Sequence, residues 1–219
     1  MSEGDFIVKF WSPIVEKLFM GSMMRPHWGD TIPDTFKPLV RSKTGKPLRM
    51  DLRMICMSTL TEVDISAGEF AKHITPAKYY HDKLKLVLSA KAQLNSIVKE
   101  YKLGLEQTKD IRICMVQVMG LEAELNMLQL VANGIYILQK GVHFKILSAL
   151  EDMQTGMKSL VAGLSIMKSI HTEKHAHDGK CMATLIQAEG TTEPARGAEA
   201  RAWTRDLYHF VSDETTSAT

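Results

Sequence analysis

No proline occurs between Pro76 and Pro194, and this gap constrains the fold more than any other feature of the 219-residue sequence. Proline interrupts helices because it has no amide hydrogen and its ring clashes with the preceding turn. The other five prolines all precede residue 50. The middle of the chain is therefore free to be helical over a long distance, whereas the N-terminal part is not.

Within the proline-free region, apolar residues between positions 146 and 171 recur in alternating steps of four and three. This spacing places them on one stripe of an α-helix, the arrangement by which a helix packs against another helix. The stripe consists of Ile146, Leu150, Met153, Met157, Leu160, Leu164, Met167 and, at its end, His171. The pattern predicts a long amphipathic helix.

A second long helix is predicted to begin at Thr75. Thr75 followed by Pro76 has the composition of an N-cap and a first helical position. The alternation by four and three then continues from Leu84 to Leu105, and Lys91 is its one interruption. These residues indicate a helix that packs along most of its length.

Residues 110–140 show the same spacing from Val118 to Ile135. The first part is ambiguous, because the apolar residues in 111–115 also alternate with the period of two that is typical of a strand. The later part, LEAELNMLQL, is rich in residues that favour helices. We therefore expect a third helix from about Val116.

Two short helices are also predicted. Ser66 and Glu69 have the spacing of a capping box, which favours a helix over residues 64–74. A serine followed by Pro13 indicates the start of a helix that extends to about Met20.

The N-terminal region contains one predicted strand. Prolines and glycines in residues 21–47 are typical of a long irregular segment. In residues 48–57 (LRMDLRMICM), apolar and polar side chains alternate, which predicts a half-buried strand. Its neighbour is residues 111–118, residues 181–187 or a strand of another protein, and the sequence does not choose between them.

Together these elements predict a mainly α fold: a bundle of three long antiparallel helices plus short helices, with a small irregular N-terminal lobe that contains at least one strand. Residues 1–65 are expected to form the lobe and residues 66–187 the helical bundle. Residues 188–219 are expected to be a flexible tail with a short amphipathic segment.

A local excess of basic residues is the first candidate site. The net charge of +2 is too small to imply a polyanionic partner, so such an argument has to be local. Six basic residues and a single acid, Asp51, lie in the segment 37–53. They could contact the phosphates of a nucleic acid or of an anionic membrane, although lysines in loops are often simply solvated. The basic residues are Lys37, Arg41, Lys43, Lys46, Arg49 and Arg53.

A histidine cluster is the second candidate site. His171 and His175 are one helical turn apart, and His177 or Cys181 could complete a tetrahedral zinc site. The alternative is that these residues are polar side chains at a helix end, where a protonated imidazole favours the C-terminal dipole. We expect no obligatory cofactor, with zinc as the candidate if this cluster binds metal.

Aromatic residues near both ends are candidates for partner binding. Phe6, Phe10 and Trp11 could form a patch for a partner groove or a membrane interface, or dock onto the core of the protein. In the tail, Trp203, Leu207 and Phe210 have one-turn spacing. They could fold onto the bundle or onto a partner.

The sequence also suggests a cellular compartment. Three widely spaced cysteines make no disulfide framework, which favours a reducing compartment. The N-terminus shows no secretory signal, and the longest uncharged run, residues 125–139, is too short to span a membrane. We therefore expect an intracellular protein, in the cytoplasm or peripheral to a membrane, with no transmembrane segment.

No catalytic motif is recognisable, so the leading hypothesis is a non-enzymatic structural or interaction protein. It would self-associate and bind partners through helical faces. One alternative is a polyanion-binding protein of the viral nucleocapsid, matrix or accessory type, which would bind RNA or an anionic membrane through residues 37–53. A second alternative is a metal-dependent enzyme that uses the cluster from His171 to Cys181.

Overall fold

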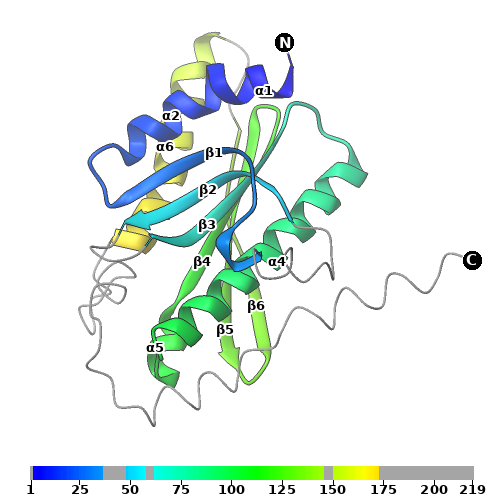
Figure 1. Ribbon diagram of the computed structural model, residues 1–219. Coiled ribbons are helices and arrows are strands. Elements are labelled where there is room, and N and C mark those ends of the chain that lie inside the picture. Colours follow the sequence, from blue (N-terminus) through cyan, green and yellow to red (C-terminus); the bar gives the residue numbers. More distant parts are fainter. Residues whose placement is uncertain (1, 37–47, 58–61, 146–149, 173–219) are drawn as a thin grey trace, which may run out of the picture.

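The computed structural model is built on a six-stranded mixed β-sheet with helices on both faces (Figure 1). It describes residues 2–36, 48–57, 62–145 and 150–172, and in the last helix the side chains of residues 154–169. The predicted bundle of three long helices, and with it the helical-bundle and coiled-coil character, is therefore wrong.

The elements follow one another in a simple order. Four short elements begin the chain or follow the first strand: α1 (Glu3–Phe6), the π-helical turn η1 (Ile7–Trp11), α2 (Ser12–Phe19) and the 3-10 helix η2 (Asp34–Phe36). The strands are β1 (Met24–Thr31), β2 (Met50–Met57), β3 (Glu62–Ala71), β4 (Arg112–Met119), β5 (Glu122–Ala132) and β6 (Ile135–Lys145). The remaining helices are α4 (Pro76–Glu100), α5 (Leu105–Asp110) and α6 (Leu150–Thr172).

The strands lie in the sheet in the order of the sequence. All neighbours are antiparallel except β3 and β4, which are parallel and are joined by the crossover through α4 and α5. The sheet is continuous from β1 to β6, and the boundary predicted between residues 65 and 66 falls inside β3.

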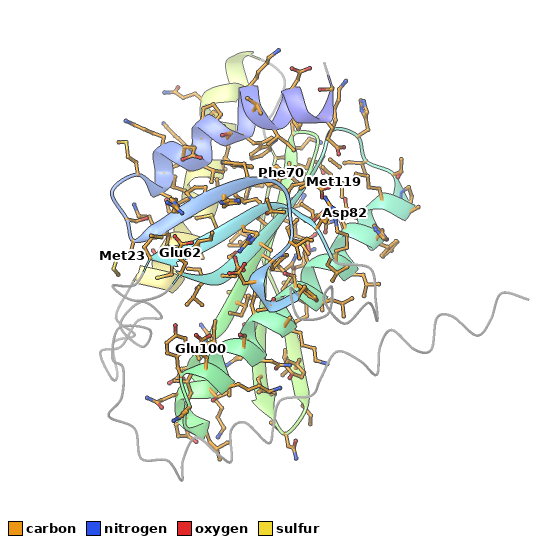
Figure 2. The ribbon with its side chains drawn as sticks, viewed as in Figure 1. Met23, Glu62, Phe70, Asp82, Glu100 and Met119 are labelled. Carbon is orange, nitrogen blue, oxygen red and sulfur yellow. The ribbon has the colours of Figure 1, made fainter. Side chains whose placement is uncertain are left out.

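One face of the sheet is covered by the N-terminal helices and α6, and it is apolar. Figure 2 places Phe70 of β3 beneath the N-terminal helices, where its ring meets that of Trp11 at 5.8 Å. The other members of this core come from α2, α6 and the central strands: Val15, Phe19, Leu52, Met54, Val116, Val118, Leu164 and Met167. The opposite face lies against α4.

Two of the three long helices are confirmed. The Thr75 Oγ1 accepts a hydrogen bond from the Lys78 amide at 3.2 Å, so α4 begins at the predicted N-cap. In α6, the predicted stripe is buried at Leu160, Leu164 and Met167. These helices pack against a sheet and not against each other. The apolar periodicity of a single helix cannot distinguish packing on a sheet from packing on another helix.

The third predicted long helix is wrong, because residues 112–145 form β4, β5 and β6. β4 is buried on both faces, so the alternation seen at 111–115 does not continue through the strand. β5 does alternate, since Glu122, Glu124 and Asn126 lie on the α4 side. The prediction followed the helix-forming composition of β5 and did not use this pattern. It also missed the hairpin that the Asn-Gly turn at 133–134 marks.

The N-terminal predictions are partly confirmed. β2 lies where a strand was expected, but its neighbours are β1 and β3 and neither of the two segments proposed. The short helix predicted at 64–74 is wrong, because Glu62–Ala71 is strand β3. The segment 21–47 was expected to be irregular, yet it contains β1 despite Pro26. Proline is tolerated there because β1 is an edge strand.

The packing of α6 on β6 gives a first prediction. A Cβ added to Gly163 would lie 2.6 Å from Cδ1 of Phe144, whose side chain is buried. Gly163→Ala should therefore lower the free energy of unfolding by about 1–3 kcal/mol, measured by urea denaturation. Gly4→Ala, in α1, is the control: its nearest neighbour is Ser2 Oγ at 3.9 Å, so it should be neutral or slightly stabilising. Equal effects of the two changes would contradict this packing.

Candidate functional site

The interface between α4 and the sheet contains charged side chains that are almost fully buried. Glu69 of β3 is 2% exposed, and its Oε2 lies 2.6 Å from Nζ of Lys85 on α4. Burial, together with repulsion from Asp51 of β2, raises the pKa of Glu69 to about 8. Asp82, labelled on α4 in Figure 2, is also 2% exposed and lies 3.1 Å from Lys78.

A second cluster of polar and charged side chains surrounds Glu124 of β5. Glu124 accepts hydrogen bonds from the Tyr79 hydroxyl at 2.9 Å, from Lys83 Nζ at 2.8 Å and from Asn126 Nδ2 at 2.7 Å. Burial raises the pKa of Glu124, but the bonds from Lys83, Asn126 and Tyr79 outweigh this and lower it overall. Glu124 is therefore ionised at neutral pH and is held by α4 on one side.

This group forms one wall of a pocket of about 150 Å³ at the start of α4 and the adjoining ends of β4, β5 and β6. Gln117 of β4 lines the pocket and is 2% exposed. Its Nε2 donates to the Tyr79 carbonyl at 2.8 Å, whereas its Oε1 is buried with no partner among the described residues. The lining residues are Ile74, Tyr79, Gln117, Met119, Glu122, Ala123, Glu124 and His143.

The rim of the pocket is also charged. Glu122 Oε1 lies 2.7 Å from Lys145 Nζ, and its Oε2 lies 3.6 Å from His143 Nε2. The hydrogen bond from Lys145 lowers the pKa of Glu122, which therefore carries its negative charge at neutral pH. Sequence reasoning missed this pocket because it assigned β5 and β6 to a helix.

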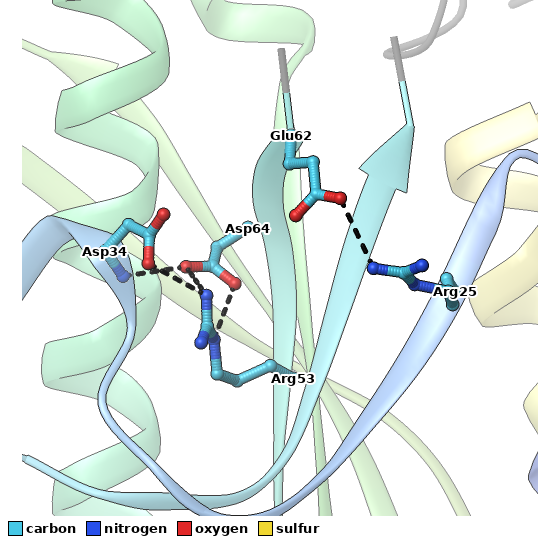
Figure 3. Close-up of polar contacts among 5 residues, drawn as sticks. All are labelled: Arg25, Asp34, Arg53, Glu62 and Asp64. Carbon is cyan, nitrogen blue, oxygen red and sulfur yellow. Dashed lines mark hydrogen bonds and ion pairs between the residues drawn. The ribbon is translucent and has the colours of Figure 1, made fainter.

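The predicted polyanion site is only partly within the described residues. Arg53 is occupied by carboxylates: its Nε and Nη2 donate to Asp64 at 2.8 Å each, and Nη2 also reaches Asp34 at 3.2 Å (Figure 3). A phosphate would have to displace these partners. Arg49 is exposed and pairs with Asp30 at 3.1 Å. The other four members, Lys37, Arg41, Lys43 and Lys46, lie outside the described residues, so the site stays a prediction.

The aromatic residues at the N-terminus form a stacked cluster. Phe6 and Trp11 are 6% and 1% exposed, and the rings of Phe6 and Phe10 stack at 5.8 Å. Trp11 packs on Phe70, which corresponds to the alternative of docking onto the core. The tail residues Trp203, Leu207 and Phe210 lie outside the described part of the chain.

The predicted metal cluster is likewise not placed. The backbone of His171 is in the last turn of α6, and His175, His177 and Cys181 lie beyond the described residues. Among the side chains that are described, no three histidine, cysteine, aspartate or glutamate residues are close enough to hold a metal ion. Burial raises the pKa of the Cys114 thiol to about 12, so this side chain is not an activated nucleophile.

The two edge strands of the sheet, β1 and β6, differ in how readily another strand could pair with them. β1 contains Pro26, and its register shifts between Trp28 and Thr31. β6 is 11 residues long and contains no proline. Its first half exposes large apolar side chains: Ile135 is 56%, Ile137 43% and Leu138 41% exposed. Such an edge is able to pair with another strand.

A scan against protein-family models finds no match, and searches of curated proteins and of solved structures find none either. Across the described residues, no helix is both long enough and apolar enough to cross a membrane.

The buried ion pair gives a second prediction. Replacing Arg53 with methionine leaves Asp64 buried without its cation, because these side chains are 9% and 2% exposed. Arg53→Met should lower the free energy of unfolding by about 3–5 kcal/mol. In the exposed pair of Arg49 with Asp30, Arg49→Met should cost less than about 1 kcal/mol. Thermal and urea unfolding measure the loss of stability in both variants. If Arg53→Met cost less than Arg49→Met, Arg53 would not be needed to stabilise the buried Asp64.

Glu69 gives a third prediction, on pH dependence. Between pH 4.5, the ordinary pKa, and about pH 8, unfolding releases the proton that the folded protein holds on Glu69. Stability therefore falls as the pH rises through this window, by on the order of a few kcal/mol. Glu69→Gln removes this contribution, so its unfolding free energy relative to wild type should rise from pH 4.5 to 8 and then level off. Glu106→Gln, at an exposed pair with Lys109, should leave the slope unchanged. If the stability of Glu69→Gln changed with pH as steeply as that of wild type, Glu69 would not be the group that holds this proton.

Proposed function

We propose that the protein is a non-enzymatic structural or interaction protein that self-associates through the edge strand β6. The observation that carries this proposal is the row of exposed apolar side chains on β6, an edge strand that has no further neighbour among the described residues. Sheet edges in monomeric proteins are normally protected by charge, proline, a bulge or a covering element. The first half of β6 has neither a charged side chain nor a proline, whereas β1 contains Pro26, and among the described residues no element covers this edge.

The exposed side chains project from both faces of the strand. Ile137 is opposite Gln129 of β5, and Leu138 is opposite Leu128, so the two neighbours point to opposite faces. A strand that pairs with β6 would therefore bury apolar surface on both sides. This arrangement supports strand pairing more than the docking of a helix onto one face.

A second copy of the same strand is a suitable partner. Antiparallel pairing of β6 with itself is isologous and closes around a two-fold axis. In a register centred on Leu138, that residue lies beside its symmetry mate and Lys140 lies opposite Tyr136 of the partner subunit. No two lysines then face each other, so the pairing avoids the repulsion of like charges across the strands.

The second half of β6 is less accessible. α6 packs against β6, with Phe144 against Gly163, and the side chain of Phe144 is 3% exposed. The pairing is therefore expected to involve mainly the half of β6 that begins at Ile135. A short interface of this kind favours a concentration-dependent equilibrium over a permanent dimer.

A charge in the exposed half of β6 provides the fourth prediction. Wild-type protein should show a mass that rises with concentration in size-exclusion chromatography with light scattering. Ile137→Lys should remain a monomer over the same range, because a lysine would be buried against a second strand. The control is Val161→Lys on α6, where the residue is equally exposed at 43% but is not on the edge.

Circular dichroism checks that both variants retain the fold. A wild-type protein that is monomeric at every concentration would overturn the proposal. Association that survives Ile137→Lys and is lost in Val161→Lys would assign the interface to α6 instead.

A further inference from the structure

We propose that the C-terminal segment 203–210 of the same chain binds a groove between α2 and the start of β1. The groove has a volume of about 510 Å³ and also reaches the end of β2. Trp203, Leu207 and Phe210 would occupy it, and they belong to residues 173–219, which lie outside the described part of the chain. The contact lies within one molecule and does not depend on the self-association of β6.

Methionines form much of the apolar surface of the groove. Met20, in the turn after α2, is 65% exposed, and Met57, the last residue of β2, is 36% exposed. The Met57 amide donates to the Met23 carbonyl at 2.9 Å, which holds the end of β2 beside this turn. Exposed apolar side chains that gather in one place are typical of interaction sites. Flexible thioether side chains adapt to different partners and make favourable contacts with aromatic rings, so the groove is suited to aromatic residues.

The sequence of the C-terminal segment has the pattern that such a groove requires. Trp203, Leu207 and Phe210 follow one another by four and three residues, so in a helix they would share one face. Helices that bind in apolar grooves use anchor residues with this spacing. The groove has roughly three times the volume of a cavity that holds benzene, which is room for three large apolar side chains.

The end of α6 brings this segment within reach of the groove. Lys168, near the end of α6, donates from Nζ to the Leu18 carbonyl at 3.0 Å, and the next residue, Phe19, lines the groove. α6 ends at Thr172, one turn further on, and 30 residues separate it from Trp203. A flexible linker of this length spans roughly 30 Å and gives a tethered segment an effective concentration on the order of millimolar. Even a weak contact is therefore favoured within one molecule.

The charges on the rim of the groove agree with this occupant. Glu16 accepts a hydrogen bond from an indole nitrogen of β1 at 2.9 Å, and Arg25 pairs with Glu62 at 3.3 Å (Figure 3). Lys17 is exposed and has no ion-pair partner among the described residues. Residues 188–219 contain six acids and three arginines, and in a helix Asp206 would lie beside the apolar face of the segment. An acidic tail is therefore attracted to this rim.

The test uses the NMR spectrum of full-length protein labelled with ¹³C at the methionine methyl groups. In wild type, the rings of Trp203 and Phe210 should shift the Met20 and Met57 methyl signals away from the position of solvent-exposed methionines. Removal of both rings, by Trp203→Ala with Phe210→Ala, should return the two signals to that position. Tyr208→Ala is the matched control, because it removes a ring from the same segment but outside the apolar face, and it should leave both signals unchanged.

Oxidation by hydrogen peroxide provides a second measurement. A bound segment shields the thioethers of the groove, so Met57 should be oxidised roughly three times faster in the double variant than in wild type. On the groove side, Met20→Glu should also release the segment and return the Met57 signal to the exposed position. Its control is Val8→Glu, because Val8 is 66% exposed, as Met20 is, but lies on η1 outside the groove.

A mixture of the labelled double variant with unlabelled wild type distinguishes the source of the segment. The labelled signals should keep the exposed position, because each wild-type segment occupies its own groove. A return of the shift would show that the segment binds a second copy, and this would overturn the contact within one molecule. Unshifted Met20 and Met57 signals in wild type, or a shift that survives the double variant, would overturn the proposal as well. Ile137→Lys should retain the shift, so the outcome is separate from that of β6 pairing.

Discussion

The parallel pairing of β3 with β4 is the constraint on which the rest of the fold depends. Parallel neighbours cannot be joined by a tight turn, so the chain must cross over one face of the sheet, and α4 and α5 provide this crossover. The pairing also needs close packing, since a Cβ on Gly68 would lie 2.8 Å from Cγ1 of Val116. The antiparallel strands β1–β3 and the antiparallel strands β4–β6 are thereby joined into one sheet. Its central strands, β3 and β4, are buried on both faces.

The two faces of the sheet are stabilised in different ways. Beneath the N-terminal helices and α6 the contacts are apolar and non-directional. Beneath α4 they are directional: Lys85 reaches Glu69 on β3, and Lys83 reaches Glu124 on β5. A shift of α4 by one turn would break both contacts and leave the ionised Glu124 buried without its cation, which is costly. The charged residues therefore specify where α4 lies, at some cost in stability.

The sequence predicted the two long helices with one exposed face and failed for most of the strands. α4 and α6 show a clear helical period, and both were predicted. β2 was predicted from its alternating sequence, although the structure buries it on both faces. β3 and β4 are also buried on both faces, and both were assigned to helices in whole or in part. β5 was assigned to a helix because its composition favours helices, although Glu122, Glu124 and Asn126 alternate along it. The pocket could not be predicted at all, because Gln117 and Glu124 become neighbours only through the register of β4 with β5.

The two candidate surfaces lie on the same strand but rest on different physical grounds. At one end of β6, the main-chain groups and apolar side chains beginning at Ile135 have no covering element among the described residues. At the other end, His143 borders the pocket that Gln117, Glu122 and Glu124 line. Next to His143, the packing of Phe144 against Gly163 fixes this end of β6 to α6. A charge at Ile137 therefore tests the proposed strand pairing without changing a residue that lines the pocket or the contact with α6.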